Sequence, residues 1–357
     1  MRAYNFSAGP ATLPEEVLKE AQAELLDYQN SGMSIMEMSH RGKEYSAIHD
    51  ETIANIKKLL NIPEGYSVLF MTGGASSQFA LIPMNLLGEG QTADYTSSGA
   101  WATKAIKEGQ LLGKVNVVAE CGKEIPTRVP TLGELNLTDG AAYLHITSNE
   151  TISGAQWKEF PEHETLIADM SSDILSRPLD VSKFGLIYAG AQKNLGPAGI
   201  TLVIIRDELA ERCPDTVPTI MRYKTHIANN SLFNTVPTFP VYMLCLVTRW
   251  LLAKGGLEAM QQQNEEKAAK LYAAIDGTDF YTGTAVKENR SSMNVTFRIA
   301  NEELEAQFIA EAAEKNLKGL KGHRSVGGIR ASIYNAFPAE GVDALISFMK
   351  EFEAANG

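Results

Sequence analysis

Two apolar runs that flank a loop of small residues constrain this chain more than any other feature. Residues 186–188 and 200–205 are rich in β-branched, aromatic and leucine side chains, which predicts two buried strands. The loop between them contains three glycines, which allow tight turns, and one lysine, Lys193. Among Ala, Gly and Leu neighbours the ammonium loses hydration, its pKa falls, and the free amine becomes nucleophilic enough to form a Schiff base. A surface lysine on an ordinary loop is the alternative, and this apolar setting argues against it.

Composition and charge exclude several classes of function. A chain of 357 residues with 44% hydrophobic and 21% charged residues is typical of a soluble globular protein with a substantial core. The net charge of −11 disfavours nucleic acids and acidic membranes as partners. An acidic protein that binds anions must therefore gather its basic residues locally.

Targeting and cysteine patterns indicate a cytoplasmic protein. No apolar run reaches the ~20 residues of a membrane-spanning helix, and the N-terminus lacks the apolar segment of a signal peptide. Cys121, Cys213 and Cys245 are widely spaced and form no CxxC motif. We therefore expect reduced thiols, with neither a disulfide framework nor a metal site.

A glycine turn between a strand and a helix offers a possible phosphate site. Residues 66–72 resemble a short buried strand, and Gly73 and Gly74 follow before an apolar run that predicts a helix. Such a turn presents free backbone N–H groups and the positive end of the helix dipole. Any strand-to-helix turn can contain two glycines, so the pattern alone does not establish the site.

Asp169 ends another predicted strand, over residues 165–169. A carboxylate at the carboxyl end of a strand in an α/β sheet points to where ligands bind. An N-cap of the next helix is the alternative role. The interval between Asp169 and Lys193 leaves room for a crossover at 174–184 between successive strands.

The run Tyr-Ala-Gly-Ala-Gln-Lys-Asn-Leu-Gly-Pro-Ala-Gly at 188–199 resembles the lysine segment of class V aminotransferases. These are fold type I enzymes that use pyridoxal 5'-phosphate (PLP), and the run is most similar to the phosphoserine aminotransferase family. The opening Asn-Phe-Ser-Ala-Gly-Pro at 5–10 resembles the start of the same family. The similarity covers nearly the whole chain. It implies a homodimer with shared active sites, in which Lys193 holds PLP covalently.

The resemblance also implies how the cofactor is bound. Trp101 would stack on the pyridine ring, a contact that adds about 0.5–1.5 kcal/mol to the burial of its area. Asp169 would keep the ring nitrogen protonated, so that the ring stays an electron sink. Ser76 stands where some family members have an arginine, so other donors must neutralise the phosphate. The implied set is Ala75, Ser76, Trp101, Thr151, Asp169, Gln192 and Lys193, with Asn234 and Thr235 from the neighbouring subunit.

Basic residues gather in two short segments. His323, Arg324 and Arg330 fall within eight residues, and His40 and Arg41 are adjacent. A guanidinium can bind a carboxylate or phosphate bidentately, although a solvated basic loop is the simpler explanation. The resemblance implies that Arg330 binds the substrate α-carboxylate. The other four residues, with His40 and Arg41 coming from the partner subunit, would receive the phosphate or the side-chain carboxylate of glutamate.

The predicted elements indicate an α/β fold with two domains. With the resemblance, we expect a large PLP-binding domain at 16–260, with a mostly parallel central sheet flanked by helices. A small α+β domain at 261–357 would be joined by the N-terminal segment 1–15. We expect helices at 14–30, 44–60, 241–254 and 257–275, and a strand with a variable connection at 115–130. Strands at 293–299 and 327–334 and helices at 302–316 and 341–354 would complete the small domain.

The implied reaction is transamination of 3-phosphohydroxypyruvate with L-glutamate, which gives O-phospho-L-serine and 2-oxoglutarate in serine biosynthesis. Lys193 would be displaced by the amino acid and would then move the Cα proton to C4′ of the cofactor, as base and then as acid. A phosphorylated hydroxythreonine substrate, on the route to pyridoxine, stays open.

Two other functions compete with this interpretation. A cysteine desulfurase needs a nucleophilic cysteine on a mobile loop near the C-terminus, whereas the last cysteine, Cys245, falls in a predicted helix. A catalytically silent binding or regulatory protein of the same fold would not need Lys193, Asp169 and Trp101 together.

Overall fold

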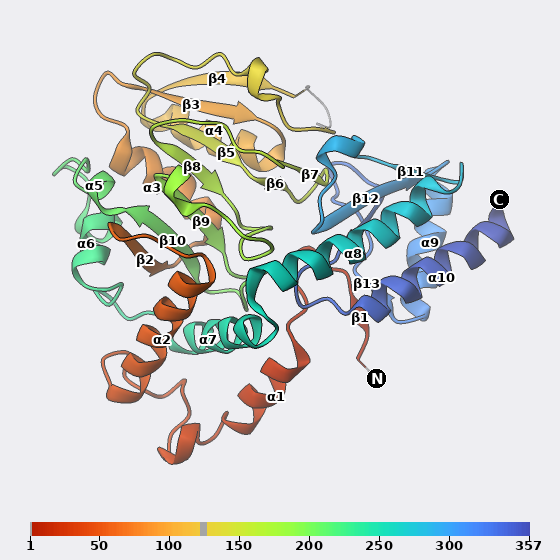
Figure 1. Cartoon of the computed structure of the whole chain (residues 1–357), viewed down its shortest axis with the longest axis horizontal. Coiled ribbons are helices and arrows are strands. Elements are labelled where there is room, and N and C mark those ends of the chain that lie inside the picture. Colours follow the sequence, from red (N-terminus) through yellow and green to blue (C-terminus); the bar gives the residue numbers. More distant parts are fainter. Residues whose placement is uncertain (1, 122–126) are drawn as a thin grey trace.

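A seven-stranded sheet forms the centre of the described part of the molecule, residues 2–121 and 127–357 of the computed structural model (Figure 1). The strand order is β2-β10-β9-β8-β5-β3-β4. Strands β9, β8, β5, β3 and β4 are parallel, and β10 is antiparallel to both of its neighbours, so the expected mostly parallel sheet is confirmed. The bounds are β2 Tyr66–Met71, β3 Thr92–Ser97, β4 Lys114–Glu120, β5 Leu144–Thr147, β8 Leu166–Asp169, β9 Leu186–Gly190 and β10 Thr201–Arg206.

Both faces of this sheet are covered by helices. Leu186 and Tyr188 of β9 pack into an apolar cluster with α3 and α4, while Ile187 and Ala189 pack into a second cluster with α2 and α7. A strand that is buried on both faces has a continuous apolar sequence, which explains the runs on either side of Lys193. The helices here are α1 Glu15–Ala23, α2 Lys43–Leu59, α3 Gly74–Leu86, α4 Ala100–Leu112, α5 Asp207–Ala210, α6 Tyr223–Ala228 and α7 Thr238–Ala253.

The helix expected over 14–30 is wrong in its second half. Helix α1 ends at Ala23, and a short 3-10 turn, η1 (Tyr28–Asn30), follows. Gln29 has a φ of +50°, a left-handed conformation that is incompatible with a continuing helix. Leu25, an apolar residue of this stretch, is 36% exposed and does not extend the buried face of α1. The other predicted helices begin and end within one helical turn of their expected bounds.

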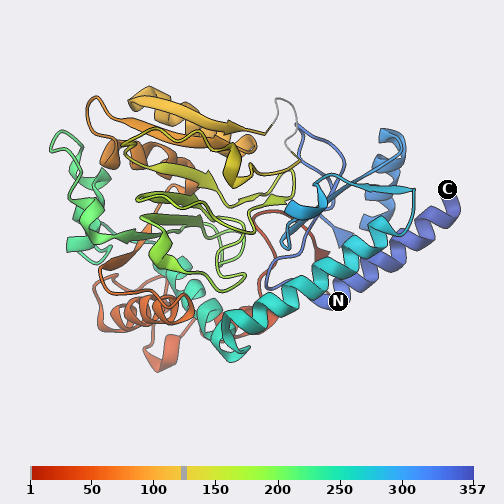
Figure 2. The ribbon, with the colours of Figure 1, turned by 45° about the horizontal axis from the view of Figure 1, so that its top comes forward.

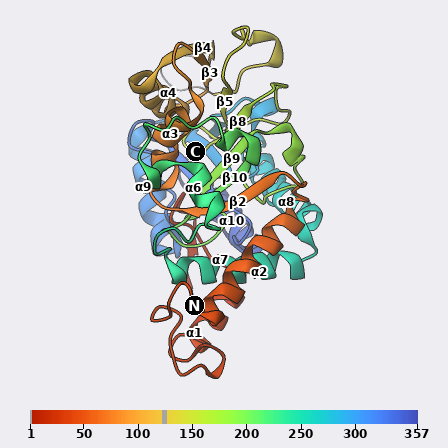
Figure 3. The same ribbon diagram turned by 90° about the vertical axis from the view of Figure 1, so that its left-hand side faces the viewer.

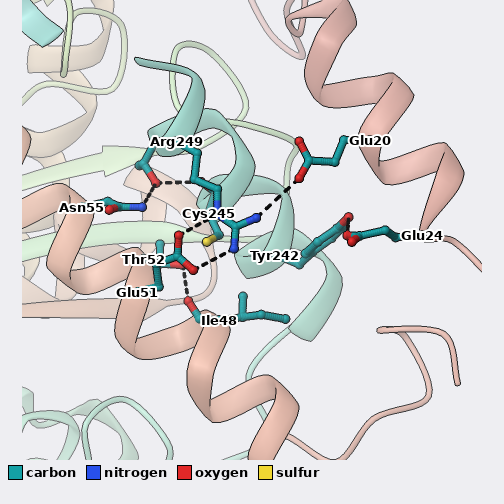
Figure 4. A network of polar contacts seen from close by, with 10 residues as sticks. Glu20, Glu24, Ile48, Glu51, Thr52, Asn55, Tyr242, Cys245 and Arg249 are labelled. Atoms are coloured by element: carbon teal, nitrogen blue, oxygen red, sulfur yellow. Dashed lines mark hydrogen bonds and ion pairs between the residues drawn. The ribbon is translucent and has the colours of Figure 1, made fainter. Parts of the chain in front are cut away.

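Helices α1 and α2 are held on α7 by a polar network (Figure 4). Arg249 of α7 donates to Glu51 of α2 through Nε at 2.6 Å and Nη2 at 2.7 Å. This charged hydrogen bond lowers the pKa of Glu51. On the same helix the hydroxyl of Tyr242 donates to Glu24 at 2.5 Å. The network fixes the base of the segment between α1 and α2, which projects from the body of the molecule (Figure 3).

The C-terminal part lies beside the large sheet (Figure 2), and it has its own apolar core. A three-stranded antiparallel sheet in the order β11-β12-β14 packs against α8, α9 and α10. The N-terminal strand β1 pairs in parallel with β13 of this part. The bounds are β1 Tyr4–Asn5, α8 Gly256–Asp276, β11 Tyr281–Gly283, β12 Asn294–Ile299, α9 Glu302–Glu314, β13 Leu317–Lys318, β14 Ile329–Ser332 and α10 Ala339–Asn356.

Helix α8 contributes to both cores. Leu257 and Met260, at its start, belong to the core of the large sheet, and Leu271 and Ile275 belong to the C-terminal core. We therefore propose that the large and the small domain divide near residue 260, and that α8 joins them.

Two further expectations concern the outer edge and the membrane. The strand predicted at the start of 115–130 is β4, whereas residues 122–126 of the expected connection lie outside the described residues. Among the described helices, none has the length and apolar character that crossing a membrane requires.

Candidate active site

Lys193 lies in the loop, residues 191–200, between β9 and its antiparallel neighbour β10. The amide of Ala191 donates to the carbonyl of Ile200 at 2.9 Å, and the amide of Gly196 donates back to Ala191 at 2.9 Å. The partly buried lysine side chain donates from Nζ to Oγ1 of Thr151 at 2.6 Å. The loop therefore aims the amine at the carboxyl edge of the parallel strands.

Burial of Lys193 favours its free amine. Burial lowers the pKa of Lys193 to about 8, although the carboxylates of Asp169 and Glu150 oppose this shift. A neutral amine is consequently available close to neutral pH, as the apolar sequence around the lysine predicted. Such an amine can act as a nucleophile or as a base.

Three other predicted residues follow parallel strands at the same edge of the sheet. Trp101 lies at the start of α4, which follows β3; Thr151 comes after β5 and the short strand β6 (Asn149–Glu150); and Asp169 ends β8. Because the carboxyl ends of parallel strands meet at one edge, these side chains come together around Lys193. The Nζ of Lys193 lies 5.3 Å from the centroid of the Trp101 ring.

Asp169 is buried, with 4% of its surface exposed. Its Oδ1 accepts a hydrogen bond from the amide of Ser171 at 2.9 Å. Burial raises the pKa of Asp169, and the nearby Lys193 ammonium opposes the shift. The alternative role as a helix N-cap does not apply, because the described chain from β8 to β9 holds only a 3-10 turn, η3 (Val181–Lys183).

The glycine turn after β2 leaves the start of α3 open. Gly73 has a φ of +90°, and none of the described side chains caps the helix. The first-turn amides of Ala75 and Ser76 are therefore free to bind an anion. Ser76 is exposed.

Arg330 of β14 is linked to the residues around Lys193 through Thr151. Its Nη1 donates to the carbonyl of Thr151 at 3.3 Å, and its Nε is buried without a hydrogen-bond partner among the described residues. Burial lowers the pKa of Arg330. A half-buried guanidinium with an unused donor is suited to binding a ligand carboxylate.

His323 and Arg324 lie on the loop that precedes β14. Burial lowers the pKa of His323, and the positive charges of Arg330, Arg324 and Lys104 lower it further. Lys104 stands in the first turns of α4, with Nζ 4.1 Å from the centroid of Trp101. The loop and α4 thus build a basic rim on an otherwise acidic protein.

The remaining predicted residues lie elsewhere. Arg41 donates from Nη2 to the carbonyl of Leu232 at 3.5 Å, which places His40 and Arg41 beside the loop that contains Asn234 and Thr235. Among the described hydrogen bonds, none joins these four residues to Lys193. Asn234 lines a cavity of about 160 Å³ together with Gly73.

Sequence reasoning missed three neighbours of the site. Glu150 is fully buried, burial raises its pKa to about 7, and its Oε1 accepts from Ser98 at 3.1 Å. A Cβ placed on Gly9 would lie 3.1 Å from Cγ of Lys193, so the N-terminal segment covers the lysine stem. Lys104 is the third. The N-terminal motif was a signal for Gly9, whereas no local pattern marks Glu150 or Lys104.

The site residues fit PLP. The uncapped start of α3 suits a phosphate, Asp169 suits a protonated ring nitrogen, the Trp101 ring suits a stacked pyridine, and Lys193 presents a free amine. Gln192 lies partly buried beside Lys193, with its side chain against Gly9 and Gly190.

Comparison with known proteins shows the family to which the chain is similar. A family model described as Aminotransferase class-V matches residues 3–345. A phosphoserine aminotransferase of Niallia circulans is 56% identical and covers 100% of this chain and 99% of its own length. One from Geobacillus kaustophilus is 57% identical over 98% of each chain.

Solved structures agree with these relatives. The phosphoserine aminotransferase from Bacillus circulans subsp. alkalophilus superposes with a TM-score of 0.98 at 56% identity, covering 100% of this chain and 99% of the other. A PLP-bound phosphoserine aminotransferase from Trichomonas vaginalis has a TM-score of 0.94 at 43% identity, covering 98% of this chain and 100% of the other.

Proposed function

Because the chain belongs to the phosphoserine aminotransferases of the class V aminotransferase family, we propose that it transfers an amino group between L-glutamate and 3-phosphohydroxypyruvate. The products are O-phospho-L-serine and 2-oxoglutarate, in the biosynthesis of L-serine. One observation carries the proposal beyond family membership: the low-pKa amine of Lys193 lies between Trp101 and Thr151, and Thr151 also contacts Arg330.

The chain's own residues divide the chemistry among them. PLP, when bound, supplies an aldehyde and a ring that accepts the electrons of a broken Cα–H bond. Lys193 would hold the cofactor and, once released, would take the proton from the substrate Cα and return it to the cofactor. Asp169 would hold the proton on the ring nitrogen, and Trp101 and Thr151 would orient the ring. The amides of Ala75 and Ser76 would receive the cofactor phosphate.

The basic groups account for a substrate with two anionic ends. Arg330 binds the α-carboxylate, which glutamate and phosphoserine share. His323 and Arg324, with Lys104 nearby, receive the phosphate or the distal carboxylate. Their mutual repulsion is relieved when an anion binds, so the rim favours a phosphate dianion.

We also propose a homodimer in which the two sites are shared. Arg41 contacts the loop that contains Asn234 and Thr235, and among the described hydrogen bonds none joins His40, Arg41, Asn234 or Thr235 to Lys193, which supports a role in the partner's site. The segment before α2 exposes Leu26 at 86% and Met36 at 55%, which supports an interface there. The three reduced, buried cysteines support a cytoplasmic location.

The competing functions have less support. A cysteine desulfurase needs an accessible thiol, and Cys245 is fully buried inside α7. Burial also raises the pKa of Cys245 to about 11, which removes its nucleophilic form at neutral pH. A silent binding protein would not need the low-pKa lysine.

A substrate comparison tests the proposed function. The purified holoenzyme is assayed with O-phospho-L-serine, L-serine and L-alanine as amino donors to 2-oxoglutarate, and kcat/KM is measured for each. Hydrogen bonds to a charged group contribute about 1.5–3 kcal/mol each, so phosphoserine should exceed serine by roughly 10- to 150-fold or more. Equal values for phosphoserine and serine would contradict a phosphate-specific site.

A further inference from the structure

Three buried asparagines from distant parts of the chain bind three successive carbonyls. Asn194 donates from Nδ2 to Ile174 at 2.6 Å, Asn335 to Leu175 at 2.7 Å, and Asn264 to Ser176 at 3.1 Å. We name Asn194, Asn335 and Asn264 the asparagine ladder.

The members of the asparagine ladder also bind one another. The backbone N–H of Asn335 donates to Oδ1 of Asn194 at 3.0 Å, and Asn264 donates from Nδ2 to Oδ1 of Asn335 at 2.8 Å. Their exposed fractions are 7% for Asn194, 2% for Asn335 and 1% for Asn264. Asn335 is the middle member and contacts both of the others.

The ladder joins the segments that present the reacting groups. Asn194 directly follows Lys193, and Asn335 follows β14, which carries Arg330. The carbonyls belong to residues 174–176, one turn beyond Asp169, where the amide of Ile174 donates to Met170 at 2.9 Å. The ladder thus connects the lysine turn, the strand of Arg330 and the end of the Asp169 strand.

The carbonyl segment needs these bonds. Leu175 is 1% exposed and has a φ of +57°, a left-handed conformation that is unfavourable for leucine. Its carbonyl is turned to the Nδ2 of Asn335. A strained residue persists only where its surroundings hold it, and here the ladder does so.

Helix α8 fixes the outer side of the ladder. Lys267, one turn after Asn264, is 1% exposed and donates from Nζ to the carbonyls of Ile333 at 3.0 Å, Tyr334 at 2.7 Å and Phe337 at 3.1 Å. The residues on both sides of Asn335 are thereby held on α8. Asn335 has no freedom to move without breaking several hydrogen bonds.

We propose that Asn335 is a positioning residue that fixes the distance and orientation between Lys193 and Arg330. Resting on the proposed function, this placement sets the substrate Cα against the lysine amine when Arg330 binds the α-carboxylate. Small displacements of a bound substrate reduce the rate strongly, so a link between the two groups serves catalysis directly. The same link holds for glutamate and phosphoserine, because both carry the α-carboxylate.

The test compares Asn335→Ala, which removes the side-chain bonds to Leu175 and Asn264 but keeps the backbone N–H that donates to Asn194, with a matched control, Asn85→Ala. Asn85 is also fully buried, donates to Leu81 and Met221 at 2.9 and 2.8 Å, and accepts from Tyr223 at 3.0 Å, in a region that the ladder does not touch. Both variants are made as PLP-loaded enzyme. The melting temperature, the dissociation constants of glutamate and phosphoserine, kcat, and the pH midpoint of the bound-cofactor absorbance are measured.

We expect both variants to lose thermal stability, but only Asn335→Ala to weaken both substrates alike by at least about tenfold and to shift the absorbance midpoint. If Asn335→Ala matches Asn85→Ala in substrate affinity, kcat and midpoint, the ladder is only structural and the proposal is wrong. Should Asn335→Ala not fold, Asn194→Ala replaces it, since it removes the acceptor for the backbone N–H of Asn335 and the donor to Ile174. If Asn335→Ala shifts the absorbance midpoint but the wild type does not turn over phosphoserine, the proposed function is wrong and the positioning role of the ladder stands.

Discussion

The side chain of Thr151 accepts a hydrogen bond from the ammonium of Lys193, with 2.6 Å between Oγ1 and Nζ. The carbonyl of the same residue accepts one from Arg330 at 3.3 Å. One threonine after β5 therefore contacts both the amine proposed for catalysis and the guanidinium proposed for the α-carboxylate. Positions near this contact should be the most sensitive to small changes.

Thr151→Val keeps the shape of the side chain and removes its hydrogen bond to Lys193. A hydrogen bond of this kind contributes about 0.5–1.5 kcal/mol, so we expect kcat to fall roughly 2- to 13-fold. Thr151→Ser retains the hydroxyl and should stay close to wild type in the same steady-state assay. A Thr151→Val enzyme as active as the Ser variant would show that the hydroxyl has no part in catalysis.

Lys193 gives the cofactor-free protein a specific pH dependence of stability. Its pKa is about 8 in the folded protein and about 10.4 in an unfolded chain. Between these values the unfolded state binds more protons, so the stability contributed by Lys193 rises with pH.

Urea unfolding of cofactor-free wild type and Lys193→Met at pH 7.5 to 10.5 measures this term. The free energy of unfolding of Lys193→Met should exceed that of the wild type by less as pH rises. The change in this difference should be at most about 3 kcal/mol in total, because the lysine is only partly buried. Parallel curves for the two proteins would mean that the lysine is not perturbed.

Asp169→Asn should separate cofactor binding from catalysis. An amide of the same size cannot hold a proton on the ring nitrogen, so the ring accepts electrons less well in the transition state. Losing a charged hydrogen bond of about 1.5–3 kcal/mol should slow each half-reaction roughly 10- to 150-fold. Equilibrium dialysis against PLP should show a much smaller loss of occupancy. Comparable losses in rate and in occupancy would instead indicate a structural role.

Variants of Arg324 and Arg330 should affect the two half-reactions differently, because the two arginines are proposed to bind opposite ends of the substrate. Arg324→Ala should impair the phosphoserine half-reaction at least several-fold more than the glutamate half-reaction, because a phosphate dianion offers more charge and more acceptors than a carboxylate. Arg330→Ala should impair both alike. Stopped-flow absorbance of the bound cofactor measures each half-reaction, with inorganic phosphate as a competitor. Equal damage to both substrates from Arg324→Ala, with unchanged phosphate inhibition, would place Arg324 outside the phosphate site.

Local sequence patterns were sufficient for the parts of the fold that are built from continuous segments. The apolar runs around Lys193 predicted β9 and β10 because both faces of those strands are buried. Lys193 and Asp169 could be placed at one edge because parallel strands share it. The family resemblance, and no spacing, supplied the roles of Trp101 and Arg330.

The rest depends on contacts between distant segments. Glu150 meets Ser98, and Asn335 meets Asn194, across intervals that no periodicity encodes. The second half of the helix predicted at 14–30 is wrong because Leu25 is apolar yet exposed, in a segment that we propose as a dimer interface. A periodic pattern cannot tell a side chain that faces its own core from one that faces a partner.

The most direct test of the central claim is to locate the amine that holds PLP and to ask which substrate releases it. Borohydride fixes PLP irreversibly on that amine, and peptide mass spectrometry then identifies the modified lysine. We expect a single modified peptide that contains Lys193, its absence in Lys193→Ala, and its loss when phosphoserine, but not serine, is added before the borohydride. Modification of another lysine, or equal protection by serine and phosphoserine, would contradict the account.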